Sequence, residues 1–125
     1  MGIRASLSKP LARYIVKDQN KWSANPQKYQ LEIFKNLINT ASNTVFGKDH
    51  DFKDIANYEE FKLRVPIRDY ESLKPYIDRV TNGESDVLWK GKPEYLSKTS
   101  GTTSGTKYIP ITKESMPNHI NSARN

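Results

Sequence analysis

Hydrophobic positions recur at helical spacing through most of the N-terminal part of the chain. Asn25-Pro26 combines an N-cap residue with a proline at the first helical position, which predicts the start of a helix. We expect this helix to end by Gly47, with Val45 and Phe46 folded back on it. It would bury a wide apolar face formed by Ile33, Phe34, Leu37, Ile38 and Ala41.

Two shorter helices are predicted further along the chain. Asn57 with Glu60 has the spacing of a capping box, and Val65-Pro66 ends that helix because a residue before proline is pushed out of the helical region. Asp69 is the expected cap of the next helix, which ends at Gly83. Its apolar face would be formed by Tyr70, Leu73, Ile77 and Val80.

The connecting segments are polar or rich in turn residues. Residues 48–55 predict a loop that carries His50, and residues 83–93 predict a turn-rich segment. Trp89, within that segment, is expected to pack in the core, although it could instead stack on an adenine ring. Thr112 is expected to cap a final helix whose inward-facing residues are Met116 and Ile120.

The N-terminal segment, residues 6–22, predicts a basic amphipathic helix. A membrane-surface helix, an organelle transit segment and N-myristoylation at Gly2 are alternative interpretations. We favour a helix that packs its apolar stripe on the rest of the domain. That stripe consists of Leu7, Leu11, Tyr14 and Ile15.

Eight consecutive Gly, Ser or Thr residues, from Thr99 to Thr106, lie between two β-prone segments that contain Tyr95 and Tyr108. Glycines in this loop permit positive φ angles, which turn backbone N–H groups inward, and the hydroxyls and flanking lysines add further donors. These are the parts of a concave anion site. The sequence therefore predicts a β-hairpin whose tip binds phosphates.

Two better-known phosphate motifs do not fit this loop. The P-loop needs four residues between its glycines and a lysine directly after the second. Three residues separate Gly101 from Gly105, Thr106 precedes Lys107, and Pro110 blocks the helix that should follow. The dinucleotide fingerprint GxGxxG is absent. A flexible linker or an ordinary hairpin turn is the remaining alternative.

Composition narrows the class of protein. A helical part followed by a hairpin places the 125-residue chain in the α/β class. It has no cysteine, which excludes disulfides and thiolate zinc sites, and we expect no metal ligands in it.

Four basic residues precede the first acidic one, Asp18, and supply most of the net charge of +6. The rest of the chain therefore has no strong basic surface, and we expect no nucleic-acid partner. Without a signal peptide or an apolar run of about 20 residues, we expect a cytoplasmic protein with no membrane partner.

The loop resembles the phosphate-loop signature SGTTGxPK of the adenylate-forming superfamily, which includes the acyl- and aryl-CoA ligases. It departs from that signature at Ser104, Gly105 and Thr106, and these departures disfavour a CoA ligase. Two wider blocks, residues 65–80 and 83–112, are similar to the auxin-responsive Gretchen Hagen family of acyl-acid amido synthetases in its bacterial form. The similarity extends over nearly the whole chain from about Phe34 onward.

This resemblance implies that residues 1–125 are the N-terminal portion of a larger adenylate-forming domain, with the chain incomplete at its C-terminus. The implied function is ATP-dependent activation of a carboxylic acid as an acyl adenylate, followed by amide formation with an amino acid. Mg²⁺ would accompany ATP on ligands outside this chain, and the remainder of the same enzyme would be its partner. An acyl-CoA ligase-like enzyme and a non-catalytic anion-binding or interaction module are the alternatives. The implied ATP-binding residues are Ser100, Gly101, Thr102, Thr103, Ser104, Gly105, Thr106 and Lys107.

Overall fold

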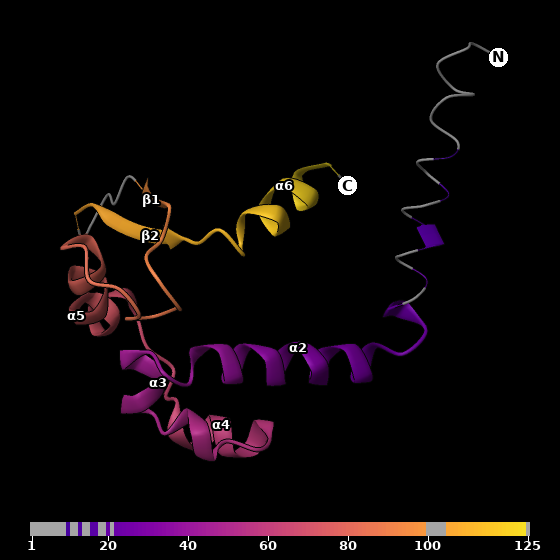
Figure 1. The fold of residues 1–125 in the computed structure, drawn as a ribbon, viewed down its shortest axis with the longest axis horizontal. Helices are drawn as coiled ribbons and strands as arrows, with labels where there is room; N and C mark the ends of the chain where they lie inside the picture. Colours follow the sequence, from indigo (N-terminus) through magenta and orange to yellow (C-terminus); the bar gives the residue numbers. More distant parts are fainter. Residues whose placement is uncertain are drawn as a thin grey trace, which may run out of the picture. The chain divides into compact units, whose positions relative to one another are not determined.

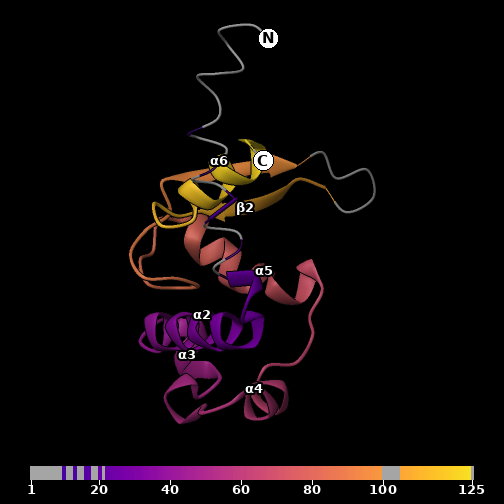
Figure 2. The same cartoon turned by 90° about the vertical axis from the view of Figure 1, so that its right-hand side faces the viewer.

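The computed structural model describes residues 10, 13, 16, 17, 20, 22–99 and 105–124. Helices come first and a two-stranded antiparallel hairpin follows, so the expected combination of helices and a hairpin is confirmed (Figures 1 and 2). The chain divides into two compact units, Met1–Asn36 and Leu37–Asn125. The elements are α2 (Pro26–Ala41), α3 (Val45–Asp49), the 3-10 turn η1 (Phe52–Asp54), α4 (Tyr58–Arg64), α5 (Tyr70–Thr81), β1 (Tyr95–Thr99), β2 (Lys107–Ile111) and α6 (Met116–Arg124).

The first unit contains the start of α2. The side chain of Asn25 accepts a 3.3 Å hydrogen bond from the Lys28 amide, and Pro26 is the first helical residue, as predicted. Ile33 was expected in the core, but it is 59% exposed. The predicted apolar stripe of the N-terminal segment lies outside the described residues, so its packing stays a prediction; it comprises Leu7, Leu11, Tyr14 and Ile15.

The end of α2 differs from the prediction. The helix ends at Ala41, and Gly47 lies inside a separate short helix, α3. Thr44 separates the two, because its hydroxyl donates to the Ala41 carbonyl at 2.7 Å and accepts from the Gly47 amide at 3.0 Å. A Cβ atom on Gly47 would collide with the Ala41 carbonyl oxygen, so only glycine fits this close approach.

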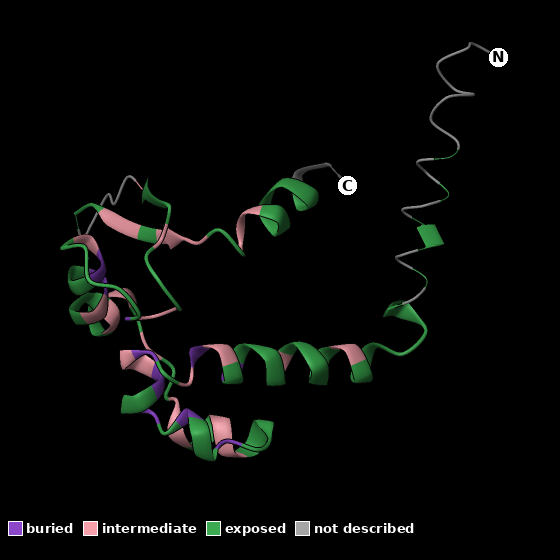
Figure 3. Cartoon of the chain, in the orientation of Figure 1, coloured by how far each residue is buried: buried purple, intermediate pink, exposed green. Residues whose placement is uncertain are grey.

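The core of the second unit is formed by residues that the sequence pattern only partly identified (Figure 3). Leu37 was expected in the core, but it is 48% exposed. Residues 48–55 were expected to form a loop, yet they include the end of α3 and η1, and His50 is buried. The buried apolar residues of this unit are Ile38, Ala41, Phe52, Ile55, Ile77, Val80 and Val87.

The caps of α4 and α5 are confirmed. The Asn57 side chain accepts from the Glu60 amide at 3.0 Å, and the Asp69 side chain accepts from the Ser72 amide at 2.8 Å. Gly83, with a φ of +86°, follows the end of α5. Both helices therefore begin where the local sequence predicts.

The last helix differs in detail from the expectation. Thr112 closes a turn, because its hydroxyl accepts from the Ser115 amide at 3.2 Å, and α6 begins only at Met116. Ile120 is 46% exposed, so the prediction that it faces inward is wrong.

The hairpin pairs β1 with β2 in a register that places Tyr95 opposite Ile111 and Thr99 opposite Lys107. Helix α5 contacts β2, the strand that follows the Gly/Ser/Thr loop. The residues of β1 are exposed except for the half-buried Thr99. The start of β2 is therefore the part of the hairpin that the helical body supports.

Candidate functional site

The structure describes the two ends of the loop predicted to bind phosphates, Thr99 at the end of β1 and the residues from Gly105 onward. Ser100, Gly101, Thr102, Thr103 and Ser104 lie outside the described residues. Gly105 has a φ of +78°, the left-handed conformation that favours glycine, and apart from its chain neighbours no heavy atom of the described residues lies within 4 Å of the position of an added Cβ. Thr106 is exposed, and Lys107 begins β2 and is half-buried. The positive φ expected at Gly105 is confirmed.

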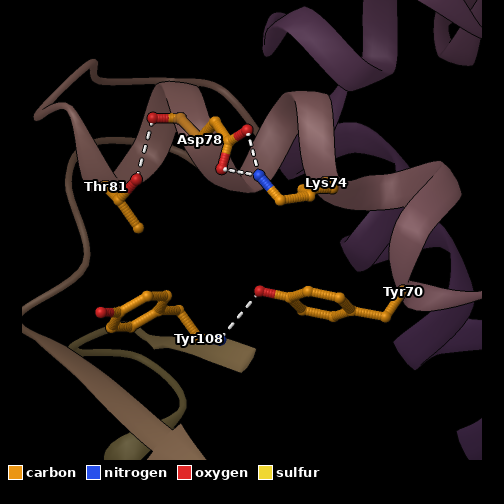
Figure 4. Close-up of polar contacts among 5 residues, drawn as sticks. All are labelled: Tyr70, Lys74, Asp78, Thr81 and Tyr108. Carbon is orange, nitrogen blue, oxygen red and sulfur yellow. Dashed lines mark hydrogen bonds and ion pairs between the residues drawn. The ribbon is translucent and has the colours of Figure 1, made fainter. Parts of the chain in front are cut away.

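Tyr70 contacts the two residues that follow this loop. Its ring lies beneath the Lys107 ammonium, with Nζ 5.4 Å from the ring centre, a cation–π distance. Its hydroxyl oxygen accepts a 2.9 Å hydrogen bond from the Tyr108 backbone amide (Figure 4). The sequence pattern placed Tyr70 on the apolar face of its helix and gave no signal of this contact, which depends on α5 packing against β2.

Asp69 adds a negative charge near the same lysine. Hydrogen bonds from the Ser72 side chain and amide lower the pKa of Asp69, and the positive charge of Lys107 lowers it further by a smaller amount. The ion pairs within 4.0 Å that join described residues do not include Lys107. Its ammonium is therefore held near a carboxylate and over a ring without a direct carboxylate partner among those residues.

Lys74, one turn along α5 from Tyr70, provides a contrast. Its Nζ atom donates to both carboxylate oxygens of Asp78, at 2.9 Å and 2.7 Å (Figure 4). These contacts raise the pKa of Lys74. The ion pair is exposed, so it contributes little to stability. The Asp78 carboxylate nevertheless offsets the positive charge of Lys74. Lys107 is thus better placed than Lys74 to bind an incoming anion.

The described part of the second unit also contains a polar cleft and a small apolar cavity away from the hairpin tip. A polar cleft of about 360 Å³ is lined by Asn39, Thr40, Asn43, Thr44, Asp86 and Lys90. A cavity of about 20 Å³ lies among Val80, Val87, Trp89 and Pro110, and the buried Nε1 atom of Trp89 has no hydrogen-bond partner in the described part of the chain. The smaller cavity has room for about one water molecule and not for an adenine ring, and Trp89 itself is half-buried.

His50 is a buried polar residue with a structural role. Its Nδ1 lies 2.7 Å from the Phe46 carbonyl oxygen and its Nε2 lies 3.0 Å from Nη2 of Arg68. A carbonyl only accepts and a guanidinium only donates, so Nδ1 carries the proton and Nε2 accepts. The ring also stacks on Phe46 at a centroid distance of 4.1 Å. Both ring nitrogens of His50 therefore have partners within the protein. His119 on α6, by contrast, is exposed.

The described residues offer no group of three or more histidine and carboxylate side chains that could hold a metal ion. None of the helices among them is long and apolar enough to cross a membrane. Lys107, at the start of β2 and beside the Gly/Ser/Thr loop, is a cation suited to an anionic ligand.

Comparison with known proteins identifies the family of the chain. The profile described as the GH3 family N-terminal domain matches residues 15–124. The indole-3-acetic acid-amido synthetase GH3.2 of Arabidopsis thaliana is 33% identical over 95 residues, which is 74% of this chain and 17% of that protein. The jasmonoyl-L-amino acid synthetase JAR6 of Nicotiana attenuata is 33% identical over 91 residues, which is 71% of this chain and 16% of that protein.

The similarity is higher over a shorter segment in a third relative. The indole-3-acetic acid-amido synthetase GH3.15 of Arabidopsis thaliana is 41% identical over 64 residues, which is 50% of this chain and 11% of that protein. This chain therefore spans less than a fifth of the length of each of these relatives. The match over residues 15–124 shows that the chain belongs to the GH3 family and corresponds to its N-terminal domain.

Proposed function

We propose that this chain provides the N-terminal, ATP-phosphate-binding part of an acyl-acid amido synthetase. The observation that carries the proposal is the family match, since relatives in this family are named amido synthetases. The structure adds an ammonium without a direct carboxylate partner among the described residues, Lys107, at the end of a loop rich in glycine and hydroxyl groups. Such a loop beside a lysine is suited to a polyphosphate.

The proposed reaction has two steps. A carboxylate oxygen of the acid substrate attacks the α-phosphorus of ATP, the bond to the bridging oxygen breaks, and pyrophosphate leaves with that bond's electron pair. The amine of an amino acid then attacks the acyl carbon of the adenylate, an amide forms, AMP leaves and the amine loses a proton. Positioning and charge stabilisation are what a protein contributes to the first step.

The residues of the loop divide into three roles in this proposal. Gly101 and Gly105 allow the backbone to approach the phosphates closely, and Lys107 supplies a positive charge. A hydroxyl-rich loop suits a reaction that must release pyrophosphate, because hydroxyls bind phosphate more weakly than a cluster of arginines does. The proposed hydroxyl donors are Ser100, Thr102, Thr103, Ser104 and Thr106.

The rest of the reaction is assigned to segments beyond this chain. Mg²⁺, which would offset phosphate charge, is proposed to bind on ligands supplied beyond this chain. The relatives are several times longer than this chain, and we propose that their additional length corresponds to the pockets for the acid, the amino acid and adenine. The 125-residue chain alone is therefore expected to catalyse no turnover.

The test is carboxylic-acid-dependent exchange of labelled pyrophosphate into ATP by a complete synthetase that contains this chain. Changing Thr102 and Thr103 together to Ala should lower the exchange rate by more than about tenfold, because two phosphate donors are lost. The control changes two exposed residues outside the loop, Ser85→Ala with Ser122→Ala. Unchanged exchange in the loop variant would remove Thr102 and Thr103 from the site, and an absence of exchange in the unmodified synthetase would overturn the proposed function.

A further inference from the structure

We propose that Tyr70 is a positioning residue for the phosphate site, and this inference rests on the proposed function of the loop. Its ring holds the Lys107 ammonium and its hydroxyl holds the Tyr108 amide. One side chain of α5 thereby fixes both residues that follow the loop. Helix α5, which lies outside the loop, thereby takes part in nucleotide binding.

The position of Tyr70 is itself fixed by the start of α5. Tyr70 is the first residue of the helix, directly after the cap residue Asp69. The Asp69 carboxylate accepts from the Ser72 amide at 2.8 Å and from the Ser72 hydroxyl at 2.6 Å. A side chain on a capped helix end is held more precisely than one on a loop. The ring and hydroxyl of Tyr70 are therefore presented to β2 from a rigid support.

The hydroxyl contact holds the backbone of β2 at the point where the loop ends. In a two-stranded hairpin, each strand has one edge whose amides lack a partner strand. The Tyr108 amide donates to Tyr70 Oη at 2.9 Å, so α5 supplies an acceptor for this amide (Figure 4). Because Lys107 is the preceding residue, the same contact restricts the backbone from which the lysine side chain extends.

The ring contact restricts the ammonium without neutralising it. A cation–π contact attracts the ammonium to one face of the ring, while the three N–H donors stay available to other acceptors. Lys74, by contrast, donates to both oxygens of Asp78, a carboxylate that phosphate would have to displace. Lys107 can bind a phosphate oxygen while it stays on the Tyr70 ring. The expected benefit is affinity gained by pre-organisation.

The experiment compares three variants of the full 125-residue chain. Tyr70→Leu removes the ring and the hydroxyl, and Tyr70→Phe removes the hydroxyl alone. Tyr58→Leu is the matched control, because Lys62 Nζ lies over the Tyr58 ring at the same 5.4 Å, on α4. Each variant is measured without ligand, by the NMR shifts of the Lys107 side chain and hydrogen exchange of the Tyr108 amide, and then titrated with inorganic tripolyphosphate.

Tyr70→Leu should abolish the ring-current shift of the Lys107 side-chain protons, speed exchange of the Tyr108 amide, and raise the Kd for tripolyphosphate about fivefold. Tyr70→Phe should keep the ring-current shift, speed exchange of the Tyr108 amide and raise the Kd about twofold. Tyr58→Leu should leave all three quantities unchanged. Circular dichroism shows whether each variant is folded, and the Phe variant carries the test if the Leu variant unfolds.

The outcomes separate this inference from the proposed function. If the unmodified chain binds tripolyphosphate and the Tyr70 variants bind it equally well, the positioning role is overturned and the phosphate site stands. If Lys107 keeps its ring-current shift in the folded Leu variant, the ring contact does not exist in solution and the inference fails. If the unmodified chain does not bind tripolyphosphate, the proposed function fails and the positioning role fails with it.

Discussion

The backbone amide of Phe46 donates a 2.9 Å hydrogen bond to the carbonyl oxygen of Val87. The amide of Val45 makes the equivalent 2.8 Å bond to the carbonyl of Asp86. The first amides of a helix have no partner within the helix, so the turn that precedes the hairpin satisfies two amides of α3. Val87 is 1% exposed, so a side chain from the same turn also fills the core. The hairpin is thereby attached to the helical body through both backbone and side-chain contacts.

The first prediction concerns this attachment. Val87→Ala removes two buried methyl groups and should lower the free energy of unfolding by about 2 kcal/mol. The measurement is chemical denaturation followed by circular dichroism. Val16→Ala is the control, because Val16 is 51% exposed and its truncation should change stability by less than about 0.5 kcal/mol. Equal effects of the two changes would show that the turn is not packed as described.

A second prediction concerns the junction between α2 and α3. Thr44→Ala removes the hydroxyl that caps α3 and bonds the end of α2, and it should lower the free energy of unfolding by about 1–2 kcal/mol. Thr44→Ser keeps the hydroxyl and should retain most of that stability. The same denaturation measurement applies. A Ser variant as unstable as the Ala variant would attribute the loss to the methyl group and not to the cap.

A third prediction tests the role of His50. His50→Leu replaces the imidazole by an apolar side chain of similar size. The Phe46 carbonyl and the Arg68 guanidinium then lose their hydrogen bonds to His50. The expected loss is about 1–3 kcal/mol of unfolding free energy. His119→Leu, at an exposed position, should change stability by less than about 0.5 kcal/mol. If the two variants are equally stable, the hydrogen bonds of His50 contribute nothing net.

A fourth prediction follows from the lowered pKa of Asp69. Hydrogen bonds from Ser72 favour the charged carboxylate in the folded state, so its stabilising contribution is complete above the usual aspartate pKa of 3.8. That contribution is lost as the pH falls through the lower folded-state pKa. Asp69→Asn also caps a helix but does not titrate, so its stability should fall less than that of the unmodified chain between about pH 5 and pH 2. Parallel pH profiles of the thermal midpoint would contradict the assignment.

The elements that could be predicted from sequence are those that local chemistry determines. Asn25, Asn57 and Asp69 each cap the helix that follows, because a side-chain oxygen reaches an amide three residues along. The β-prone residues on both sides of the Gly/Ser/Thr loop form the paired strands. These features depend on neighbours in the chain, so a sequence pattern contains the information.

The features that were missed depend on contacts between distant segments. The sequence pattern predicts a helix end at Gly47, but the turn near Val87 provides acceptors that let α3 form around this glycine. His50 lies in a polar stretch, and it is buried because Arg68 and the Phe46 ring cover it. Tyr70 was assigned only to an apolar face, since its contacts with β2 arise from the packing of α5.

A phosphate site at the hairpin is tested most directly by an NMR titration of the 125-residue chain with ATP, and separately with AMP. We expect the amide signals of Gly105, Thr106 and Lys107 to shift with ATP and to shift far less with AMP, because the loop is proposed to bind the β- and γ-phosphates. Equal shifts with both nucleotides, or no shift of these three signals with ATP, would contradict a phosphate site at the hairpin.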